Sequence, residues 1–197
     1  MISKELFELS CKVSTGVIPC NVNEKTDTQW ALVKGERNVL VFPYTVSKLD
    51  WLQNFDFFKI PYKGMRRKWF AHRGFLNKYK SVRDDILESV QGLDNLIVTG
   101  FSQGGALATL ALEDILFNYP NITVYGASFG APRSVGWLAP QKRWHNLIRY
   151  EVNGDPVTML PPFIFGYKHV GHTVLLGAKR VIPLIKYHTE NYSKELK

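Results

Sequence analysis

The sequence lacks any long apolar run, and this absence excludes the commonest kind of membrane protein. No stretch approaches the roughly 20 apolar residues that a membrane-spanning helix needs. The N-terminus carries Glu5 and Glu8 and has no apolar core run, which is not typical of a secretory signal. From the sequence we therefore expect a soluble protein with no signal peptide, cytoplasmic by default.

Cysteine is scarce, because Cys11 and Cys20 are the only two. Two cysteines do not make a disulfide framework, and no cluster of His and Cys has the spacing of a zinc site. The two thiols either pair in an oxidising compartment or stay free and buried, and the second state is favoured. We expect no metal and no cofactor.

The chain also has no internal repeat, no low-complexity tract and no linker. Its 197 residues suit one domain with one sizeable core, so we expect a single domain over residues 1–197. Acidic residues are fewer than basic ones, 17 against 25, which gives a formal charge of +8. Such a surface favours anionic partners such as phospholipid head groups. No nucleic-acid recognition motif is present, so nucleic acid is not an expected partner.

Apolar spacing predicts helices that alternate with strands. Residues 2–13 and 75–90 carry apolar side chains at steps of three and four, which indicates two amphipathic helices, and Gly92 ends the second. Residues 103–117, rich in Ala and Leu, predict a third. The expected strands are residues 31–33 and 39–42 as a hairpin, then 96–99, 122–125, 147–152 and 180–185. This order predicts an α/β fold with a mostly parallel sheet.

The pentapeptide Gly100-Phe101-Ser102-Gln103-Gly104 fits the G-x-S-x-G pattern of a nucleophile elbow. It lies between an expected strand and an expected helix, so a tight turn lifts the serine above the sheet edge. Glycine at both ends tolerates a strained turn and a close approach of strand and helix. The start of the helix adds free backbone N–H groups and a partial positive field, which favour an oxyanion. Ser102 is therefore the candidate nucleophile.

A serine hydroxyl needs a histidine that takes its proton and an acid that orients this histidine. The chain order in hydrolases with such an elbow is serine, acid, histidine. Asp155 fits the acid, because it follows the expected strand 147–152 in a turn. Of the histidines that come after it, His188 ranks first because it lies just beyond the last expected strand. His172 ranks second, and the segment that holds His169 and His172 is either structural or lines the pocket.

Through these motifs and their order, the chain resembles the class 3 lipase family, the fungal-lipase-like α/β-hydrolases, over residues 28–192. The matching segments occur in the family's order: residues 39–45 with 50–52, 72–76, 98–108, 129–133, 153–157 with 160–162, and 169–171. The resemblance implies an α/β-hydrolase-type three-layer sandwich with a mostly parallel sheet and a nucleophile elbow.

The resemblance also implies roles for individual residues. Ser102 would be the nucleophile, Asp155 the acid and His188 the base. The oxyanion hole would consist of Thr45 and the backbone N–H of Gln103. The segment after Thr45 looks like the family's lid or its remnant.

Two places depart from the family's pattern. The family usually has His before the nucleophile and Leu or Met after it, where this chain has Phe101 and Gln103. It usually has Arg-Gly before the oxyanion residue, where this chain has Pro43-Tyr44. Elbows that read G-F-S-Q-G-G also occur in the carboxylesterase and acyl-protein-thioesterase group, which is kept as an alternative.

Aromatic and basic residues interleave over residues 51–70. If exposed, they suit an anionic membrane surface, and residues 161–165 add a second apolar rim. The alternative is core aromatics flanked by solvated cations.

We expect a serine carboxylic ester hydrolase that acts on lipid esters through an acyl-enzyme. Phospholipase A or acyl-thioesterase activity is the nearest alternative. A catalytically inactive fold that binds lipid or protein is the alternative from another class.

Overall fold

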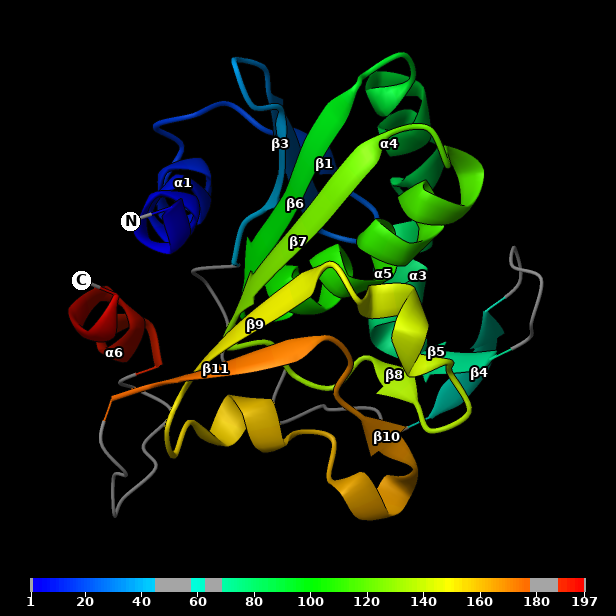
Figure 1. The fold of residues 1–197 in the computed structure, drawn as a ribbon, viewed down its shortest axis with the longest axis vertical. Coiled ribbons are helices and arrows are strands. Elements are labelled where there is room, and N and C mark those ends of the chain that lie inside the picture. The colour runs from blue at the N-terminus through cyan, green and yellow to red at the C-terminus, as the bar shows by residue number, and fades with distance from the viewer. Residues whose placement is uncertain (1, 45–57, 63–68, 178–187, 197) are drawn as a thin grey trace.

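The computed structural model describes residues 2–44, 58–62, 69–177 and 188–196. Figure 1 shows their arrangement as a ribbon. In chain order the elements are α1 (Ile2–Ser14), β1 (Asn21–Asn23), β2 (Thr28–Val33), β3 (Val39–Phe42), β4 (Lys59–Tyr62), β5 (Trp69–His72), α3 (Arg73–Lys80), α4 (Arg83–Val90), β6 (Asn95–Phe101), α5 (Gln103–Asn118), β7 (Thr123–Phe129), β8 (Val135–Gly136), η1 (Gln141–Trp144), β9 (Leu147–Val152), η2 (Pro156–Met159), η3 (Phe163–Phe165), β10 (Tyr167–Lys168), β11 (His172–Leu176) and α6 (His188–Glu195).

The main sheet of the described chain has seven strands in the order β1-β2-β3-β6-β7-β9-β11. From β3 to β11 every neighbouring pair is parallel, and β1 and β2 extend the sheet as antiparallel strands. Because parallel strands end at the same edge, the carboxyl ends of β6, β7 and β9 meet there. A smaller sheet, ordered β10-β8-β5-β4, is antiparallel throughout.

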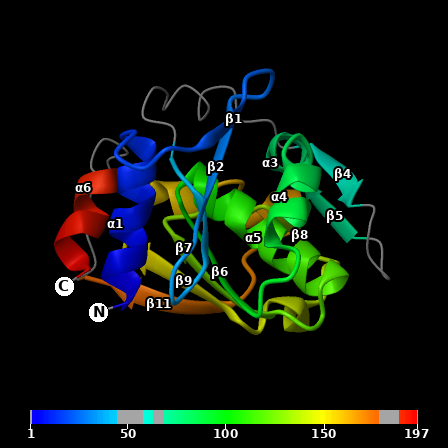
Figure 2. The same cartoon turned by 90° about the horizontal axis from the view of Figure 1, so that it is seen from above.

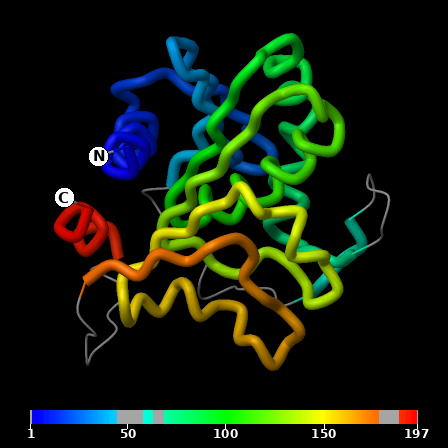
Figure 3. The backbone as a smooth tube through the Cα atoms, in the orientation of Figure 1, coloured from blue at the N-terminus to red at the C-terminus, as the bar shows by residue number. Residues whose placement is uncertain are grey.

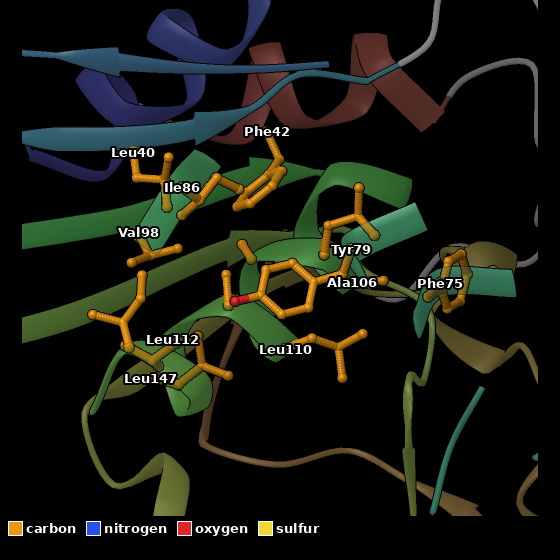
Figure 4. Packing of buried hydrophobic residues seen from close by; sticks show 14 of the residues in the cluster. Leu40, Phe42, Phe75, Tyr79, Ile86, Val98, Ala106, Leu110, Leu112 and Leu147 are labelled. Carbon is orange, nitrogen blue, oxygen red and sulfur yellow. The ribbon is translucent and has the colours of Figure 1, made fainter. Parts of the chain in front are cut away.

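Helices cover both faces of the main sheet. Figure 2 shows α1 and α6 on one side and α3, α4 and α5 on the other. Each side has its own cluster of buried apolar residues. In the larger cluster, Leu40, Val98 and Leu110 come from β3, β6 and α5 and pack together (Figure 4). The predicted three-layer α/β sandwich with a mostly parallel sheet is thereby confirmed.

The first helix and the first hairpin were predicted correctly. α1 covers the expected helix at residues 2–13, and β2 pairs antiparallel with β3 around the expected turn, with Ala31 opposite Val41. The elbow's strand and helix are β6 and α5, as expected. The strand expected at residues 122–125 extends to Phe129, and the strand at residues 147–152 is β9.

The single helix expected over residues 75–90 is wrong, because the chain forms α3 and α4 with a break at Ser81 and Val82. Contacts from the distant β1–β2 turn hold this break. The carbonyl of Ser81 accepts a hydrogen bond from Asn23 Nδ2 at 2.9 Å, and the hydroxyl of Ser81 lies 2.6 Å from Thr26 Oγ1. Gly92 follows α4 with φ of 79°, which fits its expected role as a stop.

The strand expected at residues 180–185 lies outside the described residues. The pattern missed a strand, β11, which pairs with β9. The residues of β11 are mostly exposed, so apolar and polar side chains do not alternate along it as they do along a half-buried strand.

The two ends of the described chain lie close together. Figures 1 and 3 show α1 and α6 as neighbours, and the rings of Phe7 and Tyr192 stack with centroids 6.1 Å apart. Cys11 and Cys20 are free thiols, which is the state that the sequence favoured, but they are half-buried rather than buried. Among the described helices, none is long and apolar enough to cross a membrane.

Candidate active site

Ser102 sits on the turn that joins β6 to α5. Its backbone has φ of 55° and ψ of −122°, a strained conformation for a residue with a side chain. Its N–H donates to the carbonyl of Phe129 on β7 at 2.8 Å. A Cβ added to Gly100 would lie 2.3 Å from the carbonyl oxygen of Gly104, and one on Gly104 would lie 2.1 Å from that of Phe42. Both glycines are therefore required for the close approach of β3, β6 and α5.

Gln103 is the first residue of α5. The first backbone N–H groups of a helix have no acceptor within the helix, and they carry its partial positive charge. The N–H of Gln103 therefore belongs to the end of α5 that favours an anion beside Ser102. Thr45, the other residue expected in the oxyanion hole, lies outside the described residues.

Asp155 follows β9 and caps η2. Its Oδ1 accepts a hydrogen bond from the backbone N–H of Val157 at 3.0 Å. Its Oδ2 lies 2.8 Å from Nδ1 of His188, the first residue of α6. Both side chains are buried, so little water competes for this contact. The structure thus brings together the expected acid and the first-ranked histidine.

Tyr192 is a further member of the site that the sequence reasoning did not identify. Its hydroxyl donates to Asp155 Oδ2 at 2.9 Å and accepts from the backbone N–H of Val152 at 3.0 Å. Burial raises the pKa of Tyr192 well above its ordinary value, and the Asp155 carboxylate adds to this, so the hydroxyl keeps its proton. Tyr192 lies four residues after His188 on α6, a spacing that places both on one helix face. That spacing is the signal that could have identified it.

The imidazole of His188 is held on several sides. Phe101 stacks on it, with ring centroids 4.6 Å apart, and Tyr192 meets it edge-on at 5.5 Å. Gly130 leaves room for the ring, because a Cβ there would lie 2.5 Å from His188 Cε1. Packing on these sides limits how far the ring can rotate.

Nδ1 and Nε2 of His188 are both buried, and neither forms an aligned hydrogen bond within the described part of the chain, so the 2.8 Å between Nδ1 and Asp155 Oδ2 is a close contact of the two side chains. Nε2 has no hydrogen-bond partner there. The hydroxyl of Ser102 is therefore not hydrogen-bonded to it in this structure. Their surroundings do converge, because Ser102 N–H binds Phe129, and the next residue, Gly130, touches the His188 ring. Nucleophile–base hydrogen bonds are often long without substrate and shorten when it binds.

His172, the second-ranked histidine, lies elsewhere. It begins β11, where it pairs with Ile148 near the start of β9, and its side chain is exposed. Asp155 follows the opposite end of β9. The structure therefore keeps His172 away from the expected acid.

His169 has a structural environment. Its Nε2 lies 2.8 Å from the carbonyl of Thr158 in η2 and 3.6 Å from Glu151 Oε1. Burial, with the positive charges of Arg149 and Arg133, lowers the pKa of His169 to about 3. A neutral His169 thus donates to the segment that begins at the expected acid. Within the described ranges, no group of three or more His, Cys, Asp or Glu side chains is placed to hold a metal ion.

Comparison with protein families matches residues 39–165 to the family described as Lipase (class 3). The matched segment contains the Ser102 turn and Asp155, and it ends before α6.

Known relatives in sequence are lipid hydrolases by name. A secreted mono- and diacylglycerol lipase A from Penicillium cyclopium is 32% identical over 158 residues, which covers 74% of this chain and 50% of the relative. A protein named phospholipase A1-II 6 from Oryza sativa subsp. japonica is 34% identical over 108 residues, 43% of this chain and 26% of the relative. The chain thus spans about half the length of the Penicillium relative.

Solved structures share the fold. A lipase from Rhizopus microsporus var. chinensis superposes with a TM-score of 0.76 at 21% identity, covering 90% of this chain and 75% of that one. The triacylglyceride lipase of Rhizomucor miehei gives 0.76 at 20% identity, with 88% and 77% covered.

Proposed function

The chain belongs to the class 3 lipase family, and on that premise we propose that it is a serine hydrolase that cleaves carboxylic esters of lipids through an acyl-enzyme. The observation that carries this proposal is the 2.8 Å contact between Asp155 Oδ2 and His188 Nδ1, in a buried site next to the Ser102 turn. An acid on Nδ1 selects the tautomer whose Nε2 is free to accept a proton.

The reaction proceeds in two halves. Ser102 Oγ attacks the ester carbonyl while His188 Nε2 takes the hydroxyl proton. The proton then passes to the leaving alcohol, and the acyl group stays on the serine. Water repeats the sequence and releases the fatty acid. Asp155 holds the imidazole and stabilises its positive charge in both halves.

The negative charge on the carbonyl oxygen is stabilised by the backbone N–H of Gln103 at the start of α5. Thr45 is the second donor that we propose, from its place in the family pattern. Removing one such donor typically lowers kcat by about 100-fold or more. Thr45→Ala therefore tests the Thr45 hydroxyl as this donor by kcat on a soluble ester, and unchanged turnover would show that the hydroxyl does not serve, since alanine keeps the backbone N–H.

A fluorophosphonate probe tests the hydrolase proposal directly, because it labels only an activated serine. We expect wild-type protein to be labelled and Ser102→Ala to resist. Ser193→Ala is the matched control, since Ser193 is an exposed serine on α6. A folded wild type that resists the probe would favour the alternative, an inactive fold that binds lipid or protein.

The substrate class is tested with a panel of monoacylglycerol, diacylglycerol, phospholipid and acyl-thioester substrates. The Penicillium relative's name favours the acylglycerols, and the rice relative's name keeps phospholipase A as the second candidate. The charge of +8 also favours anionic phospholipid. Turnover of thioesters alone would favour the acyl-thioesterase alternative.

We also propose that residues 1–197 form a single domain. Its support is that α1 and α6, from opposite ends of the described chain, contribute to one apolar cluster. One cooperative transition in calorimetry is expected, and two separate transitions would contradict it.

The location of the protein is a separate question. We predict the cytoplasm, whereas the Penicillium relative is named as secreted. Fractionation of cells that produce the protein decides between cytoplasm and secretion.

A further inference from the structure

An apolar surface outside the catalytic residues is exposed on η3 and beside β8. The three consecutive residues of η3 are 59%, 80% and 46% exposed, namely Phe163, Ile164 and Phe165. Trp137 and Leu138 next to them are 48% and 77% exposed. Single exposed apolar residues are ordinary, but a contiguous group indicates an interaction site. We call these five residues the η3 surface.

Hydrogen bonds hold the η3 surface in place. The rings of Trp137 and Phe163 are in contact, with centroids 4.9 Å apart. The indole N–H of Trp137 donates to the carbonyl of Tyr167 at 3.0 Å. The backbone N–H of Trp137 donates to the carbonyl of Gly166 at 3.1 Å, and the backbone N–H of Gly166 donates to the carbonyl of Phe163 at 2.9 Å. The apolar side chains are therefore presented on an ordered turn, which lowers the entropy lost on docking.

A recess opens beside this surface. Its volume is about 520 Å³, and its lining residues are Phe58, Lys59, Phe70, Gly136, Trp137, Leu138 and Gly166. The lining is apolar except for Lys59. A recess of this size is within the range that holds small ligands, so it has room for part of an acyl chain.

The chain segments that carry the η3 surface contain no acidic residue. No Asp or Glu occurs between Asp114 and Glu151, or between Asp155 and Glu190. The Nζ atoms of Lys59 and Lys168 donate to backbone carbonyls at 2.8 and 2.6 Å. Neither amine forms an ion pair with a carboxylate in the described part of the chain, and each ammonium keeps further donors for an anion.

We propose that the η3 surface docks onto an anionic phospholipid bilayer. The apolar side chains of η3, with Leu138, insert at the level of the head groups, and Lys59 and Lys168 contact lipid phosphates. Along the chain, η3 follows η2, which Asp155 caps. Delivery of lipid from a docked bilayer to the candidate active site rests on the proposed function, but the docking itself does not need Ser102.

Charge and shape favour a bilayer over a second copy of the chain. Two copies with this net charge repel each other, whereas an anionic surface attracts each of them. The exposed turn of η3 also suits insertion into a soft surface.

Vesicle sedimentation tests the docking. The Ser102→Ala protein is mixed with phosphatidylcholine vesicles with or without phosphatidylglycerol, at low and high salt. We expect binding that needs phosphatidylglycerol and weakens at high salt. Ile164→Ser and Leu138→Ser should each weaken binding about tenfold, since each removes most of an inserted aliphatic side chain. Val17→Ser is the matched control, because Val17 is 71% exposed in the loop after α1 and is not part of the η3 surface.

The charge contribution is tested by Lys168→Gln. One lysine near an anionic surface contributes about 1 kcal/mol, so we expect binding about fivefold weaker. Lys168→Arg should keep the affinity, and Lys34→Gln in the exposed β2–β3 turn should leave it unchanged. Circular dichroism checks that each variant is folded.

Two outcomes overturn the proposal. One is binding that is unchanged in Ile164→Ser and Leu138→Ser, or equal on vesicles without phosphatidylglycerol. The other is a dimer in size-exclusion chromatography that Ile164→Ser dissociates while vesicles bind nothing. Failure of the proposed function would instead be seen as absent fluorophosphonate labelling, which none of these measurements uses.

Discussion

The ring of Phe101 stacks on the imidazole of His188, with centroids 4.6 Å apart and planes inclined by 21°. Phe101 directly precedes Ser102, so the residue before the candidate nucleophile also supports the candidate base. The same phenyl ring is buried and meets the ring of Tyr44 edge-on, with centroids 5.2 Å apart. The phenylalanine that departs from the family pattern thus has a specific structural place in this chain.

Phe101→Leu should lower kcat about tenfold on a soluble ester and leave KM near the wild-type value. It keeps apolar volume but removes the planar face, so the His188 ring gains freedom, and 1.4 kcal/mol of lost alignment corresponds to tenfold in rate. Phe101→His restores a planar ring and should be more active than Phe101→Leu.

The control for this pair is Phe75→Leu, which alters a buried ring in the other apolar cluster. It should lower the melting temperature but not kcat. If Phe101→Leu retains wild-type kcat, the stack does not position the base.

Tyr192→Phe should lower both stability and kcat. It removes the hydroxyl that joins Asp155 to the backbone N–H of Val152, which is expected to cost about 1–3 kcal/mol of unfolding free energy. We expect kcat to fall about tenfold with KM unchanged, because the phenol orients the acid and does not touch substrate. Urea unfolding and steady-state kinetics measure the two effects. Tyr125→Phe, at an exposed position of β7, is the control.

A loss of stability in Tyr192→Phe with wild-type kcat would assign Tyr192 a structural role alone. Equal losses in Tyr125→Phe would show that the effect is not specific to the hydroxyl at Asp155.

Gly130→Ala should abolish most turnover, because its Cβ would lie 2.5 Å from His188 Cε1 and displace the ring. Gly130 also has φ of 54°, so alanine adds backbone strain. Gly92→Ala separates the two effects, since Gly92 has φ of 79° but nothing within 4 Å of its added Cβ. Both variants should lower the melting temperature, and only Gly130→Ala should lower kcat by about 100-fold. Similar kcat losses in both would refute the steric explanation.

Local signals were enough to predict where the main residues of the candidate site lie. The apolar strand, the two glycines and the Ala-rich helix placed the Ser102 turn between β6 and α5. The order of serine, acid and histidine selected Asp155 and His188, which the structure brings together. These placements could be predicted because they depend on neighbours in the chain and on the edge where parallel strands end.

Features that depend on distant contacts could not be predicted in this way. The break between α3 and α4 is held by Asn23 and Thr26, which no apolar period reveals. Strands β8 and β10 have two residues each, too few to show alternation. The contact of Tyr192 with Asp155 depends on how α6 docks against the sheet, which follows from tertiary packing.

His169→Gln should make the protein less sensitive to acid. The pKa of His169 is about 3 in the folded protein, and an unfolded histidine titrates near 6.5. As the pH falls below about 6.5, the unfolded chain binds a proton that the folded chain refuses, so wild-type stability decreases toward pH 3 by up to about 1.4 kcal/mol per pH unit. Glutamine has no such proton.

Melting temperatures across this pH range measure the effect as the difference between wild type and His169→Gln. Burial raises the pKa of Glu113 to about 7, so this group contributes with the opposite sign, and the difference between the two proteins cancels it. The gap should favour wild type most at neutral pH and shrink as the pH falls. His145→Gln, at an exposed histidine, is the control for the substitution itself. A gap that is independent of pH would mean that His169 is not held neutral in the folded protein.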